Sequence, residues 1–125
     1  AGILEHANFS VSDPQRTADM LCDLFDWRIR WSGDAIHGGT TYHVGGDDSY
    51  VAVYAQKGMR AAPANDYKTI GGLNHIGVVV DDLDEVEARV LAAGFETTNH
   101  GDYEPGRRFY FHDHDGIEYE VVSYA

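Results

Sequence analysis

The feature that most constrains this chain is an internal repeat of ten residues. The stretch 73–82 repeats the pattern of 4–13 at one constant offset, and a helix-like segment follows each copy. The identical positions are Leu4 and Leu73, His6 and His75, Val11 and Val80, and Asp13 and Asp82. A repeat of this kind indicates that the chain is built from copies of one structural unit. We therefore predict two modules, each with a histidine on its first strand.

Each module is predicted to form a strand, a helix and three further strands. In module one (1–56), Asp13-Pro14 is typical of a helix start, and a strong turn signal precedes the alternating strand 50–55. Residues 57–71 lack periodicity and are interpreted as a linker. In module two (72–125), Asp81 and Asp82 precede the helix, a strand is expected at 95–98, and a polar loop at 99–106 leads into a hairpin. The predicted fold class is α+β, with two βαβββ modules forming an eight-stranded open barrel.

Composition excludes several classes of partner. The formal net charge of −12, without a Lys/Arg cluster, disfavours nucleic acid and anionic membrane surfaces. No apolar run is long enough to cross a membrane, and the N-terminus lacks a signal-peptide pattern. Cys22 is the single cysteine, which excludes an intrachain disulfide and makes a cytoplasmic location the expectation.

Two carboxylates on the last predicted strand are candidates for chemistry. Ile117, Tyr119 and Val121 should face the helices, which turns Glu118 and Glu120 toward the barrel interior. An interior carboxylate is costly unless it is paired, hydrogen-bonded or metal-bound. His6, His75 and one of these carboxylates would form a two-histidine, one-carboxylate metal site with open coordination positions.

The chain resembles the vicinal oxygen chelate superfamily, which includes glyoxalase I, extradiol dioxygenases, fosfomycin-resistance transferases and bleomycin-resistance proteins. The matching motifs are His-x-x-x-x-Val-x-Asp, present at His6 and at His75, and the tail 111–120, which is similar to Phe-x-Asp-Pro-Asp-Gly-Asn-x-x-Glu. The last Glu of that tail is a metal ligand in the family, so the resemblance selects Glu120 over Glu118. It also implies a homodimer.

The chain departs from the family pattern at several positions. His114 and Ile117 replace the usual proline and asparagine of the tail motif. Glyoxalase I-like members carry a fourth ligand, a Glu, on the strand that corresponds to 50–55. Here that position falls on Tyr50 or Ala52, which counts against a four-ligand site. Asn8 stands where fosfomycin transferases carry a Thr, and the subfamily stays open.

Further candidates follow from strand parity around the predicted pocket. Phe109 and Phe111 should pack on the helix, which turns their neighbours in sequence toward the pocket. His112 is the candidate general acid or base, and Tyr50 a candidate proton donor. The candidates for substrate contact are Asn8, Tyr54, Arg108, Tyr110 and Glu118. The histidines expected in loops or at the surface are His37, His43, His100 and His114.

The function expected from these residues and the resemblance is that of a metal-dependent enzyme acting on a small molecule. A divalent ion, Fe, Mn, Zn or Ni, would chelate two neighbouring oxygens of the substrate. The reaction would be that of a ring-cleaving dioxygenase or a glyoxalase-like lyase. The alternatives are a metal-free binding protein of the bleomycin-resistance type and a fosfomycin-resistance-like thiol transferase.

Overall fold

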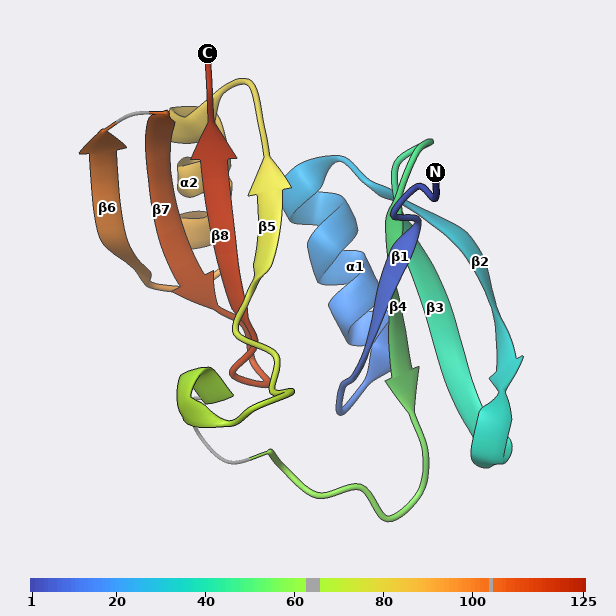
Figure 1. Cartoon of the computed structure of the whole chain (residues 1–125). Helices are drawn as coiled ribbons and strands as arrows, with labels where there is room; N and C mark the ends of the chain where they lie inside the picture. Colours follow the sequence, from blue (N-terminus) through green and yellow to red (C-terminus); the bar gives the residue numbers. More distant parts are fainter. Residues whose placement is uncertain (63–65, 104) are drawn as a thin grey trace. The chain divides into compact units, whose positions relative to one another are not determined.

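The computed structural model describes residues 1–62, 66–103 and 105–125. The chain divides into two units, Ala1–Arg60 and Ala61–Ala125, called here the first and the second unit. Each unit has one long helix against one face of a four-stranded sheet (Figure 1). The fold class is α+β with two βαβββ modules, as predicted from the repeat. Among the described residues, neither helix is long and apolar enough to cross a membrane.

In the first unit the strand order across the sheet is β1-β4-β3-β2. β1 and β4 are parallel, whereas β3 is antiparallel to both of its neighbours. The first and last strands of the module therefore lie side by side. The elements are β1 (His6–Ser10), α1 (Pro14–Phe25), β2 (Arg28–Ala35), the 3₁₀ turn η1 (Ile36–Gly38), β3 (Gly39–Gly45) and β4 (Tyr50–Ala55).

The second unit repeats this topology with the strand order β5-β8-β7-β6. Its first and last strands, β5 and β8, again pair in parallel, and the other pairs are antiparallel. A short 3₁₀ turn precedes the module. The elements are η2 (Asp66–Lys68), β5 (Ile76–Val79), α2 (Leu83–Ala92), β6 (Thr97–Tyr103), β7 (Gly106–His112) and β8 (Glu118–Ser123).

Both helices begin at the aspartates that close the repeated motif. The Asp13 side chain accepts a hydrogen bond from the backbone N–H of Arg16 at 3.3 Å, and Pro14 occupies the first helical position. Asp82 accepts in the same way from the N–H of Glu85 at 3.1 Å. Such caps satisfy backbone donors that the first helical turn leaves without partners. The predicted helix starts are confirmed.

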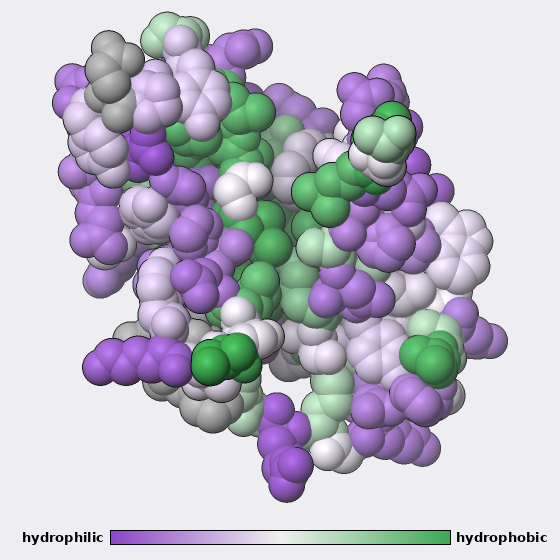
Figure 2. Space-filling model, in the orientation of Figure 1, coloured by the Kyte–Doolittle hydropathy of each residue, from purple (hydrophilic) through white to green (hydrophobic). Residues whose placement is uncertain are grey.

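The core of each unit lies between its helix and its sheet. In the first unit, Leu21 of α1 and Val44 and Val53 of the sheet are fully buried. In the second unit the largest fully buried side chains are Phe109, Phe111 and Tyr119 of β7 and β8, and Val90 of α2 and Val121 of β8 are also fully buried. Because side chains alternate along a strand, the residues between these positions lie on the opposite face. The surface seen in Figure 2 is largely hydrophilic over both units.

The sequence prediction is wrong about the segment that follows α2. A strand over 95–98 and a loop over 99–106 were expected, but β6 spans Thr97–Tyr103 and pairs with β7. The pairing is interrupted between Thr98 and Gly101, where Asn99 has a positive φ of 51°. β6 is an edge strand with mostly exposed side chains, so it lacks the apolar alternation that identifies a strand. Glu104, which was also placed in that loop, lies outside the described residues.

Candidate functional site

The sheet face opposite the core of the second unit carries a cluster of ionisable side chains. Tyr110 of β7 lies directly across from Glu120 of β8, and His112 lies across from Glu118. Arg108 is two residues before Tyr110 and shares its face. The structure thus brings together five of the residues singled out from the sequence. All five lie on the face away from Phe109 and Phe111.

Glu120 is held by two donors on one side and faces a histidine on the other. Its Oε2 accepts hydrogen bonds from Nη1 of Arg108 at 2.9 Å and from the Tyr110 hydroxyl at 2.8 Å. Its Oε1 lies 3.4 Å from Nε2 of His75, which directly precedes β5. Burial raises the pKa of Glu120, but the hydrogen bonds from Tyr110 and Arg108 outweigh it, so the pKa lies below its usual value. The carboxylate is therefore ionised and orients Oε1 toward the imidazole.

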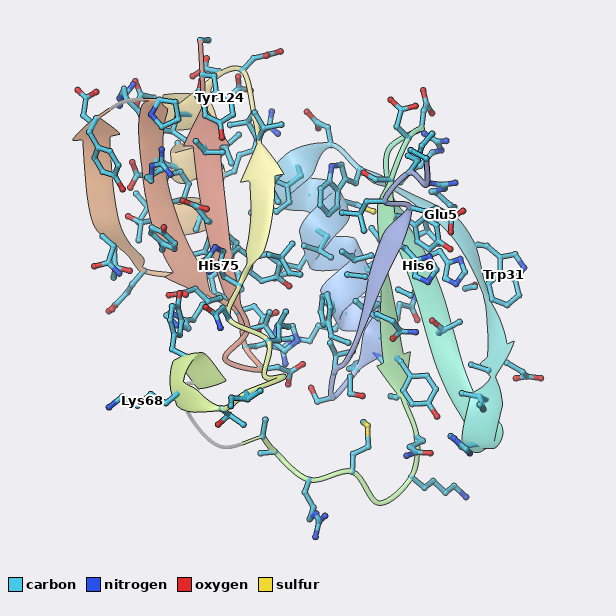
Figure 3. The ribbon with its side chains drawn as sticks, viewed as in Figure 1. Glu5, His6, Trp31, Lys68, His75 and Tyr124 are labelled. Atoms are coloured by element: carbon cyan, nitrogen blue, oxygen red, sulfur yellow. The ribbon has the colours of Figure 1, made fainter. Side chains whose placement is uncertain are left out.

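Glu118 contacts a residue that the sequence analysis did not single out. Tyr67 of η2 donates a hydrogen bond from its hydroxyl to Oε1 of Glu118, and the same hydroxyl lies 3.2 Å from Nδ1 of His75. The hydrogen bond to Glu118, with burial, raises the pKa of Tyr67 to about 12. Tyr67 was missed because it falls in the segment interpreted as a linker, where no periodic pattern assigns a face. Figure 3 shows η2, which carries Lys68, beyond the His75 end of β5.

His112 lies at the exposed edge of this cluster. Its Nε2 is 3.5 Å from Oε2 of Glu118, and 55% of its side chain is exposed. An imidazole in this position is open to solvent and next to a carboxylate. That environment suits a group that exchanges protons.

In the first unit, His6 is the first residue of β1 and lies beside Tyr50 of β4. Its Nδ1 is 2.8 Å from Oε1 of Glu5, and the Tyr50 hydroxyl donates to the same oxygen at 3.4 Å. The rings of His6 and Tyr50 are stacked, with centroids 4.9 Å apart. The hydrogen bond from His6 lowers the pKa of Glu5. Figure 3 shows Glu5 and His6 together at one end of β1.

His43 shares this face, although it was expected in a loop or at the surface. It lies in β3, is half-buried, and stacks on the other side of Tyr50 with ring centroids 4.6 Å apart. Burial lowers the pKa of His43, and the neighbouring imidazole of His6 acts in the same direction. The prediction failed because the single apolar neighbour Val44 gives too short a pattern to set the strand's parity.

Asn8 and Tyr54 occupy the same sheet face farther along β1 and β4. Asn8 is exposed and pairs with Ala52, whereas Tyr54 pairs with Ser10. The Tyr54 hydroxyl donates to the backbone carbonyl of Ile36 at 2.6 Å, which ties β4 to the turn η1. Asn8 therefore has the more accessible polar group of the two.

The donor types in both units suit a divalent cation. An imidazole nitrogen of His75 and a carboxylate oxygen of Glu120 converge in the second unit, and the first unit offers His6. Imidazole and carboxylate are ligands for Fe, Mn, Zn and Ni ions. Within either unit, the described residues contain no group of three His, Cys, Asp or Glu side chains that could hold a metal ion by itself.

Comparison with known proteins identifies the family. The family model of the Glyoxalase/Bleomycin resistance protein/Dioxygenase superfamily matches residues 3–121. The chain belongs to this superfamily. The match includes both copies of the repeated motif and the part of β8 that carries Glu118 and Glu120. No curated protein matches the chain.

Several solved structures share the fold. The glyoxylase/bleomycin resistance protein/dioxygenase domain from Frankia sp. EAN1pec has 20% identity and a TM-score of 0.83, with 98% of each chain covered. The fosfomycin resistance protein FosX from Mesorhizobium loti has 25% identity and a TM-score of 0.74, covering 98% of this chain and 91% of that one. FosX from Listeria monocytogenes, complexed with Mn(II) and sulfate, has 20% identity and a TM-score of 0.76, covering 98% and 93%.

The strand register decides which residue of the first unit corresponds to Glu120. In the repeat, Ala7 corresponds to Ile76. Ile76 pairs with Tyr119 and Ala7 pairs with Val51, so Tyr119 corresponds to Val51. Glu120 therefore corresponds to Ala52, and Glu118 corresponds to Tyr50. Ala52 is buried and carries no donor. The fourth carboxylate of glyoxalase I-like members of the superfamily has no equivalent on β4.

Proposed function

We propose that this chain is a divalent-metal-dependent enzyme of the glyoxalase/dioxygenase type. His6, His75 and Glu120 would hold the ion, and the substrate would be a small molecule with two neighbouring oxygens. The observation that carries the proposal is that Nε2 of His75 lies 3.4 Å from Oε1 of Glu120. Arg108 and Tyr110 already orient this carboxylate through its other oxygen. The ion, when bound, would act as a Lewis acid on the chelated oxygens.

The residues around Glu120 supply positioning and charge. Arg108 and Tyr110 take up one oxygen of Glu120, so the other is free to act as a ligand. Within the described residues, Nε and Nη2 of Arg108 are buried and have no hydrogen-bond acceptor. Unpaired buried donors are costly, and an oxygen-rich substrate would satisfy them. The proposed substrate contacts are Asn8 and Tyr54 in the first unit and Arg108, Tyr110 and Glu118 in the second.

His112 is proposed to move the proton in the reaction. It is exposed, next to Glu118, and has the side chain best suited to proton transfer near neutral pH. Tyr50 is a second candidate proton donor, because it stacks on His6. Replacement of His112 by alanine should lower kcat more than it changes metal content. A loss of metal would instead assign His112 to the metal site.

Elemental analysis tests the metal directly. Protein purified without chelators or metal-affinity steps should contain close to one divalent ion per chain. His6→Ala, His75→Ala and Glu120→Ala should each lose it, whereas His37→Ala, at an exposed turn position, should keep it. A metal-free protein whose ligand affinity is unchanged in His6→Ala would instead be a binding protein of the bleomycin-resistance type.

The reaction class is separated by activity assays on the metal-loaded protein. Oxygen consumption with catechols would identify a ring-cleaving dioxygenase, and isomerisation of thiol adducts a glyoxalase-like lyase. A thiol transferase or related enzyme acting on fosfomycin is the second candidate, since FosX from Mesorhizobium loti has 25% identity over 98% of this chain. Loss of fosfomycin in the presence or absence of a thiol tests it. We also expect a homodimer, which light scattering on the purified protein would detect.

A further inference from the structure

Three side chains of the second unit form a chain of contacts that ends on His75. Nδ1 of His75 lies 3.2 Å from the Tyr67 hydroxyl, and that hydroxyl donates to Oε1 of Glu118. The Glu118 side chain is only 9% exposed. Tyr67 comes from η2, outside the sheet, so the contact joins the segment before the module to the residue that precedes β5 and to the last strand, β8.

The number of protons on these groups determines which ring nitrogen of His75 carries a hydrogen. A phenol has a single proton, and a carboxylate is a stronger acceptor than a neutral ring nitrogen. The Tyr67 proton therefore points to Glu118, and the phenol oxygen must accept its second contact from an N–H. Nδ1 of His75 is the group in position to donate. A neutral imidazole that is protonated at Nδ1 has a bare lone pair at Nε2.

The other side of the ring agrees with this assignment. Nε2 of His75 faces Oε1 of Glu120 at 3.4 Å, beyond the usual range for an N–H···O hydrogen bond of about 2.7–3.2 Å. Oε2 of Glu120 already has two donors. Two atoms without protons, a nitrogen and a carboxylate oxygen, thus face one another. Such a pair is suited to a shared cation.

We propose that Tyr67 and Glu118 are positioning residues, which hold His75 in the Nδ1–H tautomer and so present Nε2 as its metal-binding nitrogen. The assignment of Nε2 as a ligand rests on the proposed function, whereas the tautomer does not. Groups that hydrogen-bond the distal nitrogen of a ligating histidine fix its orientation, and their loss costs about 10–100-fold in metal affinity.

The first unit contains the same combination in a different arrangement. Glu5 contacts Nδ1 of His6 directly, and Tyr50 donates to that glutamate. A tyrosine and a glutamate thus support Nδ1 of the repeated histidine in both units. By register, Tyr50 occupies the position of Glu118, whereas Glu5 corresponds to Asn74 and not to Tyr67. Glu5 is 62% exposed, and we expect its effect to be weaker than that of the buried Glu118.

Nitrogen-15 NMR of the metal-free protein tests the tautomer. The two ring nitrogens of His75 should show the pattern of a neutral Nδ1–H imidazole. In Glu118→Leu the phenol loses its acceptor, so its proton should turn to Nδ1 and the ring should switch to the Nε2–H tautomer. In Tyr67→Phe the fixed tautomer should be lost and a mixture should appear. Tyr124→Phe, a substitution at an exposed tyrosine, is the control and should change neither nitrogen.

Metal affinity is the second readout, measured by titration calorimetry with Mn(II). Tyr67→Phe should weaken binding by about 10–100-fold. An Nε2–H tautomer in the wild-type protein, or an unchanged tautomer in Tyr67→Phe, would overturn the proposal. If Tyr67→Phe alters the tautomer of His75 but leaves the Mn(II) affinity unchanged, Tyr67 and Glu118 have no role in metal binding. If the wild-type protein has the Nδ1–H tautomer but binds no metal, the proposed function fails while the positioning of His75 stands.

Discussion

Glu118 and Glu120 of β8 contact opposite nitrogens of one imidazole. Oε1 of Glu118 is 4.0 Å from Nδ1 of His75, and Oε1 of Glu120 is 3.4 Å from Nε2. The two carboxylates share a strand face and differ mainly in their remaining partners, which are a tyrosine and His112 for Glu118 and an arginine with a tyrosine for Glu120. This division predicts different roles for two residues that the sequence pattern does not separate.

Glutamine substitutions at the two positions should therefore have unequal effects on metal binding. Glu120→Gln removes a proposed ligand charge and should abolish measurable Mn(II) binding, a loss above about 100-fold, whereas Glu118→Gln should lose about 10-fold. Calorimetric titration of both variants measures the difference. Equal losses would show that the two carboxylates act alike.

Removal of the Tyr110 hydroxyl should destabilise the second unit slightly. Tyr110→Phe deletes the 2.8 Å hydrogen bond to Glu120 and should lower the free energy of unfolding by about 1 kcal/mol. Urea denaturation of the metal-free protein measures it. Tyr124→Phe serves as the matched control and should be neutral. A Tyr110→Phe variant as stable as wild type would mean that water replaces the hydroxyl at no cost.

The stability of the turn between β7 and β8 should depend on the side chain of Asp113. Its Oδ1 accepts from the backbone N–H groups of Asp115 and Ile117, and its Oδ2 accepts from the Tyr119 hydroxyl at 3.0 Å. Burial raises the pKa of Asp113, and these hydrogen bonds oppose that effect. Asp113→Ala removes one acceptor from three donors, of which the Tyr119 hydroxyl is buried, and should cost about 2–4 kcal/mol of unfolding free energy. Urea denaturation should show Asp34→Ala, at an exposed position of β2, close to wild type.

A double-mutant cycle can test the contact between Gly39 and Tyr54. A Cβ at position 39 would lie 2.5 Å from the Tyr54 ring, so Gly39→Ala should force that ring and its hydrogen bond to Ile36 out of place. The variant should be destabilised by about 1–3 kcal/mol, as in other overpacked sites. Gly39→Ala should cost much less in a Tyr54→Ala background, measured by urea denaturation. Additive effects would show that the backbone, and not the ring, restricts position 39.

The ion pair between α2 and β6 should make stability depend on pH. Burial raises the pKa of Glu87, but hydrogen bonds from Thr97 and His100 outweigh it and place the pKa below 4.5, the usual value for a glutamate. The lowered pKa contributes stability above pH 4.5, and this contribution is lost as the pH falls through the folded-state pKa. The stability difference between wild type and Glu87→Gln should shrink when urea denaturation is repeated from neutral pH to about pH 3. Glu96→Gln, at an exposed position, should show a much smaller pH-dependent difference.

The sequence predicted the order of the elements, because each module has clear helix caps and buried apolar stripes. Asp13 and Asp82 mark the helix starts, and the alternation around Phe109 and Phe111 assigns the faces of β7. Tyr67 and His43 could not be assigned. The position of Tyr67 depends on contacts outside any regular element, and β3 shows little apolar alternation.

The equivalence of positions between the modules also needed the structure. A constant offset from Glu120 leads to Val51, whereas the register of the sheets selects Ala52. The offset fails because the segment between the first and last strands differs by one residue between the two modules. Strand parity already moves the equivalent of Glu120 to Tyr50 or Ala52, and the hydrogen-bonded pairing of the strands selects Ala52.

The parallel pairing of first and last strands has a consequence for folding. His6 pairs with Tyr50, and His75 lies beside Glu118, so each of these contacts closes a loop that contains most of its module. Closing so long a loop costs chain entropy before the contacts that it makes can stabilise the module, and it is therefore slow. Each imidazole should thus gain its partners among the last events in folding of its module, and an ion added during refolding should bind late, after the backbone has already become native.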